Sequence, residues 1–305
     1  MHILVVAHAP LDFFGVGDTA ITSWKRFADK LRIKSSRSSS TEWITNNIDG
    51  HHPAIADYDG DGVSDLAGVR VGREGMTWNI NLSTTGSEVR KALGAPGDTL
   101  ISGCAFSAGH ASSLAVFDSS SRTLRFTSYN DANTSSVRLA GLSSLNVFGC
   151  GDSDGDGVDE LLVTTRDSRN RAVVVGYGMN GKRKLTARYK QFVRGFVVNR
   201  PNSQVPLIAV LRDGRKQGRQ VKITTMAGSF AFPLFNVSHR VSLSAGTFTT
   251  ESRDQAAGLY WADARTRLVY RQLLKEGAQT TELFTLPKGY RLARAQSVVR
   301  TERKK

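Results

Sequence analysis

Cysteine and long hydrophobic runs are scarce in this sequence, and both shortages exclude classes of protein. The 305 residues include two cysteines, Cys104 and Cys150, which are too few for a disulfide framework. They lie at near-equivalent points of neighbouring repeats, so a bridge stays open, but two buried thiols are the preferred interpretation. No apolar run approaches the roughly 20 residues that span a bilayer. The sequence therefore predicts no membrane span.

A signal peptide and the motifs of common enzymes are missing as well. The apolar stretch 3–7 is too short for a signal peptide and has no Lys or Arg before it. The chain contains no G-x-S-x-G elbow, no H-E-x-x-H helix motif and no P-loop. His51 and His52 are interpreted as an exposed turn rather than as a metal or catalytic pair. We therefore assign no catalytic and no organic-cofactor residues.

The residues that are abundant favour many short strands and a strong positive charge. Glycine occurs 29 times, hydrophobic residues make up 40% of the chain, and no convincing amphipathic helix is present. The formal net charge of +14 predicts attraction to polyanions such as acidic polysaccharide. Nucleic acid is the weaker candidate, because Tyr189, Phe192 and Phe196 alternate at the spacing of a buried strand rather than of a stacking surface.

Many of the basic residues are concentrated in one segment, in which Asp213 is the only acid. They could form a polyanion-binding face on the fourth and fifth repeats, or they could be solvated strand edges, where Lys and Arg discourage edge pairing. Both interpretations stay open. The residues are Lys182, Arg183, Lys184, Arg188, Lys190, Arg194, Arg200, Arg212, Arg215, Lys216, Arg219 and Lys222.

A repeat of about 47 residues runs through the chain. Two acidic, glycine-bearing segments, 57–65 and 152–160, lead into β-branched apolar strands, and weaker copies follow the same rhythm. The first apolar residue after each loop recurs at separations of 45, 48, 47, 46 and 52 residues, at Ile21, Leu66, Leu114, Leu161, Leu207 and Leu259. Such regular spacing predicts one structural unit used about six times.

Each repeat contains four short strands separated by turn signals, which is the pattern of a β-propeller blade. We expect an all-β propeller of about six four-stranded blades, with the two ends of the chain meeting in one blade. Seven blades, one of them incomplete, is the alternative. The whole chain, 1–305, is predicted to be one domain, with repeats at approximately 1–50, 51–98, 99–144, 145–193, 194–240 and 241–290, and a closing strand and tail at 291–305.

The two acidic loops resemble the FG-GAP/VCBS repeats of integrin α-chain propellers and many bacterial surface proteins, which carry the form D-x-D-G-D-G-x-x-D/E-L. The resemblance is specific in these two repeats, partial at 12–21, and only rhythmic in the other three. It implies that each intact loop, placed between the first and second strands of a blade, binds calcium. It also implies a role in adhesion or ligand binding.

The chemistry of the loops favours the same ion independently. Ca²⁺ prefers six to eight oxygens, and carboxylates at loop positions 1, 3 and 5 point inward if glycines at positions 4 and 6 let the backbone curl. Position 7 can add a main-chain carbonyl, and position 9 a closing carboxylate. The predicted ligands are Asp57, Asp59, Asp61, Val63 and Asp65 in one loop, and Asp152, Asp154, Asp156, Val158 and Glu160 in the other.

An EF-hand is excluded, because position 12 is Gly68 or Val163 instead of a bidentate acid, and both loops lead into strands. Loops at 12–21, 105–114 and 199–207 lack the acids and are expected to keep their shape by packing and hydrogen bonds. We therefore predict two Ca²⁺ sites.

These observations lead to a functional expectation with one alternative. We expect a secreted or cell-surface, monomeric propeller, stabilised by calcium, that acts as a non-catalytic adhesion or carbohydrate- or protein-binding module. An anionic glycan or a protein would be its ligand. The alternative is a polysaccharide-active enzyme, a lyase or hydrolase, with its site at the mouth of the propeller channel.

Overall fold

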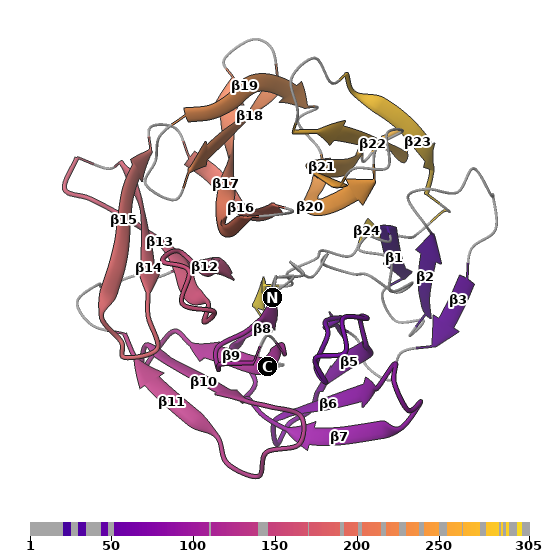
Figure 1. Ribbon diagram of the computed structural model, residues 1–305, viewed down its shortest axis with the longest axis vertical. Helices are drawn as coiled ribbons and strands as arrows, with labels where there is room; N and C mark the ends of the chain where they lie inside the picture. Colours follow the sequence, from indigo (N-terminus) through magenta and orange to yellow (C-terminus); the bar gives the residue numbers. More distant parts are fainter. Residues whose placement is uncertain are drawn as a thin grey trace, which may run out of the picture.

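The computed structural model of the chain consists of β-strands arranged in a ring (Figure 1). It describes residues 21–25, 30–34, 44–47, 52–109, 111–139, 146–169, 171–189, 192–200, 203–214, 218–225, 230–237, 241–249, 255–263, 265–274, 279–286, 288, 291–292 and 298–300. In this part of the chain, no helix has the length and hydrophobicity needed to cross a lipid bilayer.

Five sheets are each built from four consecutive antiparallel strands. The first comprises β4 (His52–Pro53), β5 (Leu66–Val71), β6 (Met76–Asn81) and β7 (Glu88–Ala92). The second comprises β8 (Thr99–Cys104), β9 (Ser113–Asp118), β10 (Thr123–Thr127) and β11 (Ser135–Arg138). The third comprises β12 (Asn146–Gly151), β13 (Glu160–Arg166), β14 (Ala172–Tyr177) and β15 (Arg183–Tyr189).

The other two consecutive sheets follow the same order. One comprises β16 (Phe192–Arg200), β17 (Ser203–Gly214), β18 (Gly218–Thr225) and β19 (Phe230–Val237). The next comprises β20 (Val241–Thr249), β21 (Gln255–Asp263), β22 (Leu268–Leu273) and β23 (Thr281–Thr285). First strands such as β8, β12, β16 and β20 lie toward the centre of the ring, and fourth strands such as β7, β11 and β15 lie on its outside (Figure 1).

The remaining sheet joins segments from opposite ends of the described chain. β24 (Arg291–Leu292) pairs with β1 (Ile21–Lys25), which continues to β2 (Lys30–Lys34) and β3 (Ile44–Asn47). β25 (Val298–Arg300) adds a fifth strand to the sheet of β8. The all-β propeller is thus confirmed. The prediction of about six blades needs correction in detail: five are blades of consecutive strands, the other sheet is composite, and no seventh sheet occurs among the described residues.

The strand positions inferred from the repeat agree with the sheets. All six anchor residues, Ile21, Leu66, Leu114, Leu161, Leu207 and Leu259, lie on the second strand of a sheet. β15 ends at Tyr189, and β16 begins at Phe192. The apolar stretch 3–7 and the partial loop beginning at Asp12 lie outside the described residues.

The second strands read as continuous apolar runs because both of their faces are buried between neighbouring sheets. On β13, Leu161 and Val163 pack toward the sheet of β9, whereas Leu162 packs toward the sheet of β17. β17 alternates in the same way, with Leu207 and Ala209 in one core cluster and Ile208 and Val210 in another. The sheets of β9, β13 and β17 are therefore each packed against a neighbouring sheet on both faces.

The tryptophans whose side chains are described lie in these cores. Trp78 is fully buried between the sheets of β5 and β9, and its indole N–H donates to the Leu93 carbonyl oxygen at 3.0 Å. Trp261 packs between the sheets of β17 and β21. The side chains of Trp24 and Trp43 lie outside the described residues.

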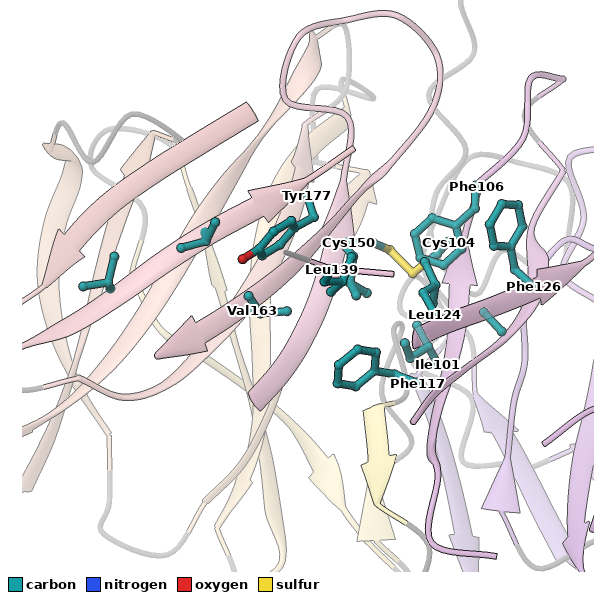
Figure 2. Close-up of a cluster of buried hydrophobic side chains, with 14 residues drawn as sticks. Ile101, Cys104, Phe106, Phe117, Leu124, Phe126, Leu139, Cys150, Val163 and Tyr177 are labelled. Atoms are coloured by element: carbon teal, nitrogen blue, oxygen red, sulfur yellow. A yellow bond between two sulfur atoms is a disulfide. The ribbon is translucent and has the colours of Figure 1, made fainter. Parts of the chain in front are cut away.

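Cys104 and Cys150 form a disulfide, so the prediction of two buried thiols is wrong. The bridge joins the ends of β8 and β12, the first strands of adjacent sheets, with 5.9 Å between the two Cα atoms. Figure 2 shows it beside Phe106, Phe117 and Tyr177 in the core that these sheets share. The equivalent positions of the two cysteines in consecutive repeats bring them together, because equivalent points of neighbouring blades face each other.

Removing the bridge should destabilise the protein. Cross-linking positions 46 residues apart restricts the unfolded chain, and bridges of this kind contribute about 2–4 kcal/mol. We expect the double variant Cys104→Ala/Cys150→Ala to lose about that much free energy of unfolding in a denaturant titration. The reduced parent protein serves as control and should unfold at the same midpoint as the variant. Two reactive thiols in the unfolded, unreduced parent would contradict the assignment.

Candidate functional site

The acidic loops connect the first and second strands of two sheets. The first acidic loop, residues 57–65, follows β4, and the second acidic loop, residues 152–160, follows β12. In an antiparallel meander, the connection between strands one and two and the turn between strands three and four lie at the same end of the sheet. The turn 82–87 therefore contacts the first loop, and the start of β15 contacts the second.

Position 1 of each acidic loop organises the backbone. Asp57 accepts hydrogen bonds from the Gly60 and Gly62 N–H groups at 2.6 and 2.9 Å. Asp152 accepts equivalent bonds from Gly155 and Gly157 at the same distances. All four glycines have positive φ between 80° and 90°, a conformation that disfavours other residues. The backbone of each acidic loop therefore curls around the carboxylate at position 1.

Position 9 braces the loop by accepting the N–H of position 2. Asp65 accepts from the Tyr58 N–H at 2.7 Å, and Glu160 accepts from the Ser153 N–H at 2.6 Å. The acid-free loop 105–113 has the same bond, in which the Ser113 hydroxyl accepts from the Phe106 N–H at 3.2 Å. An acid at position 9 thus has a structural role that serine can fill, which explains how the loop 105–113 keeps its shape.

Three carboxylates of the first loop come together. Oxygen atoms of Asp57, Asp59 and Asp61 all lie within 4.8 Å of one another. Neutral hydroxyls cover two of them: Thr84 Oγ1 donates to Asp59 Oδ2 at 2.5 Å and to Asp61 Oδ2 at 2.9 Å, and Ser83 Oγ donates to Asp61 Oδ2 at 3.0 Å. At about 4 Å, each pair of charges repels by roughly 1 kcal/mol in water and about 4 kcal/mol near a protein surface. The cluster therefore favours a cation.

Asp65 does not join this group. Its two oxygens accept backbone N–H groups from Tyr58 and Ser83, both at 2.7 Å, and the residue is fully buried. Burial raises the pKa of Asp65 to about 6, and the charge of Asp59 adds to the effect, although the two hydrogen bonds act against it. Burial also opposes ionisation of Asp61, but hydrogen bonds from Val63, Thr84 and Ser83 outweigh it and lower the pKa of Asp61.

The second loop has a different set of partners. Oxygens of Asp152, Asp154 and Glu160 lie within 4.8 Å of one another. The Lys184 ammonium lies 2.7 Å from Asp154 Oδ2, 2.9 Å from Asp156 Oδ2 and 3.0 Å from Glu160 Oε1. Hydrogen bonds to Asp154 and Asp156 raise the pKa of Lys184, and the bond from Lys184 lowers the pKa of Asp156.

The predicted ligand residues lie in the two acidic loops, but the residues that cover those loops were not predicted. The propeller pattern could have revealed Ser83, Thr84 and Lys184, because it places the turn before the fourth strand at the same end of the sheet as the acidic loop. Lys184 had been grouped with a basic face, whereas it contacts the acidic loop. The carbonyl oxygens of Val63 and Val158 remain predicted ligands. The N–H groups of the same two residues donate to Asp61 and Asp156, respectively.

Both acidic loops also contact the sheet of β8–β11. The Ser112 N–H donates to the Asp57 carbonyl oxygen at 2.6 Å. On the other side, Asp159 N–H donates to the Ala105 carbonyl oxygen at 2.7 Å, and Asp159 Oδ2 accepts from the Ala105 N–H at 2.8 Å. A change in either loop therefore acts on the boundary between two sheets.

Comparison with known proteins bears on the fold alone. No model of a known protein family matches the chain, and no curated protein is significantly similar to it in sequence. Among solved structures, it is similar to a triple arginine-to-alanine mutant of AofleA from Arthrobotrys oligospora, with a TM-score of 0.52 and 8% identity over 92% of this chain and 91% of that chain. A second similar structure is BBS1N in complex with ARL6DN, with a TM-score of 0.47 and 14% identity over 97% of this chain and 82% of that chain.

The two roles of the first loop's acids can be separated by mutation. Asp57→Ala leaves the N–H groups of Gly60 and Gly62 without their carboxylate and should cost about 1–3 kcal/mol of unfolding free energy even in chelator. Asp59→Ala, its matched control, removes a more exposed carboxylate that accepts from no loop glycine among the described contacts, and should change stability little in chelator. Denaturant unfolding of both variants in EGTA measures the difference. Equal costs would contradict a separate organising role for Asp57.

Proposed function

We propose that the protein is a calcium-stabilised β-propeller that acts outside the cell as a non-catalytic adhesion or carbohydrate- or protein-binding module. The first acidic loop is its calcium site. The observation that carries this proposal is the convergence of Asp57, Asp59 and Asp61 on one point, beside neutral hydroxyls.

The chemistry of the first loop fits a hard divalent cation. Ca²⁺ takes six to eight oxygens in flexible geometry, whereas Mg²⁺ holds its waters and requires a stricter octahedron. Asp57, Asp59 and Asp61 would hold the ion, and the hydroxyls of Ser83 and Thr84 lie close enough to turn toward it. The ion would supply the positive charge that this cluster of carboxylates calls for. Asp65 would not contact the ion but would hold the loop in place by accepting the backbone N–H groups of Tyr58 and Ser83.

The finer classification follows from the same features. The two D-x-D-G-D-G loops, placed between the first and second strands of their sheets, support assignment to the FG-GAP/VCBS type of propeller. We also propose that the composite sheet of β24 and β1–β3 serves as a sixth blade, so that pairing between Ser23 and Leu292 closes the ring.

Two observations support a location outside the cell and an anionic partner. Disulfides such as Cys104–Cys150 persist in oxidising compartments and are rare in the cytosol. The net charge of +14 favours an acidic glycan over a neutral one. Arg183 and Arg188 are exposed on β15, at the outside of the ring, where a large ligand could reach them.

Calcium should raise the melting temperature of the parent protein relative to EGTA. A ligand that binds only the folded state stabilises it by about 2.7 kcal/mol at one hundred times its dissociation constant. We expect this gain to be lost in Asp59→Ala, because Asp59 is one of the three converging carboxylates. Differential scanning calorimetry in both buffers measures it.

Thr85→Ala is the matched control, since Thr85 belongs to the same turn but donates to no loop carboxylate among the described contacts. It should keep the full calcium response. A parent protein that melts at one temperature in both buffers would sink the calcium proposal.

The charge proposal predicts salt-sensitive binding to an anionic glycan. The protein should be retained on immobilised sulfated polysaccharide at low salt and released by about 0.5 M NaCl, where the Debye length falls to a few ångströms. A neutral polysaccharide of similar size is the control and should not retain it. Equal retention on both matrices would argue against an electrostatic partner.

A further inference from the structure

The second acidic loop contains a cation that belongs to the chain itself. The Lys184 ammonium contacts three carboxylates, Asp154, Asp156 and Glu160, at 2.7–3.0 Å. An ammonium has three N–H donors, so three acceptors satisfy it fully. Glu160, at one end of this set, has only 1% of its side chain exposed.

These contacts use the oxygens that a metal ion would need. Ca²⁺ would bind carboxylate oxygens at about 2.3–2.6 Å, and Asp154 Oδ2, Asp156 Oδ2 and Glu160 Oε1 are already directed at the ammonium. Two cations cannot share that position without strong repulsion. The residues present in the second loop therefore do not fit a divalent ion, in contrast to the prediction of two calcium sites.

We propose that Lys184 is the resident cation of the second acidic loop and excludes calcium from it. The sheet is built to let the lysine reach the loop. Lys184 lies on β15 and must cross the end of β14 to reach Asp154 on the far side. A Cβ atom added to Gly178 would lie 2.9 Å from Cε of Lys184, so glycine provides the room for its stem.

The first sheet has bulkier residues at the corresponding points. Leu66 pairs with Asn81 in the first sheet, and the equivalent Leu161 pairs with Tyr177 in the third sheet. Asn81 therefore corresponds to Tyr177. The residues on either side correspond in turn, Ile80 to Gly176 and Leu82 to Gly178. The side chains that reach the first loop are the short hydroxyl residues Ser83 and Thr84. The two loops therefore share their backbone but differ in charge: hydroxyls leave the first loop negative, and Lys184 offsets part of the charge of the second.

Calcium stoichiometry in an Asp59→Ala background tests the proposal, because the first loop then makes no contribution. By equilibrium dialysis we expect no bound ion in Asp59→Ala and one in Asp59→Ala/Lys184→Met, where methionine keeps the length of the side chain without its charge. Adding Asp154→Ala should abolish that ion. Lys182→Met is the matched control, since Lys182 is an exposed lysine two residues earlier, and it should create no site.

Two outcomes would overturn the proposal: an ion in Asp59→Ala that Asp154→Ala removes, or no ion in the Lys184→Met double variant. A parent protein that binds no calcium, together with one ion in the double variant, would reject the first-loop site and leave the role of Lys184 standing.

A second measurement covers the case in which the Asp59→Ala variants do not fold. In EGTA, Lys184→Met alone should melt about 2–5 °C below the parent, because the second loop loses its cation, and calcium should restore the difference. Lys182→Met should melt with the parent. A Lys184→Met protein that melts with the parent in EGTA, and gains nothing more than the parent from calcium, would contradict the proposal.

Discussion

The burial of both faces of the second strand of a sheet is the constraint on which the rest of this structure depends. Strands such as β9, β13 and β17 are apolar at consecutive positions, so neither face can meet water without losing hydrophobic stabilisation. Sheets that cover one another in this way are arranged here as a ring (Figure 1). Polar chemistry is then confined to the strand connections, and the acidic loops lie there.

The two acidic loops share one backbone design but differ in the groups that contact their carboxylates. The bond from position 2 to position 9 is present at Asp65, Glu160 and Ser113, and it needs an acceptor but no charge. The acid at position 1 also organises the backbone, because it accepts the N–H groups of the loop glycines. Each loop must offset the repulsion among its carboxylates separately. The hydroxyls of Ser83 and Thr84 add no positive charge to the first loop, which is why we propose an external ion there, whereas the Lys184 ammonium supplies positive charge to the second loop from within the chain.

The fold and the loops could be predicted from sequence because their signals are local and repeated. The regular spacing of the anchor residues predicts the repeated four-stranded sheet. Gly60 and Gly155 indicate a positive φ in each acidic loop, which few other residues adopt. What covers a loop is not local: Lys184 lies 30 residues from Asp154, and its positive charge was consistent with a basic face as well. The equivalent positions of the two cysteines were visible in the sequence, but the sequence does not show that these positions of adjacent blades lie only 5.9 Å apart between Cα atoms, so the disulfide was not the preferred interpretation.

The acid-free loop 105–113 separates the two acidic loops along the ring. It lies between the two acidic loops, with Ser112 bonded to the Asp57 carbonyl on one side and Ala105 bonded to Asp159 on the other. A third set of carboxylates at this place would add electrostatic repulsion to both neighbouring acidic loops. Ser113 provides the structural bond without that charge. The loss of acids in this repeat is therefore compatible with the same loop fold, and it allows two charged loops to flank one disulfide-linked sheet.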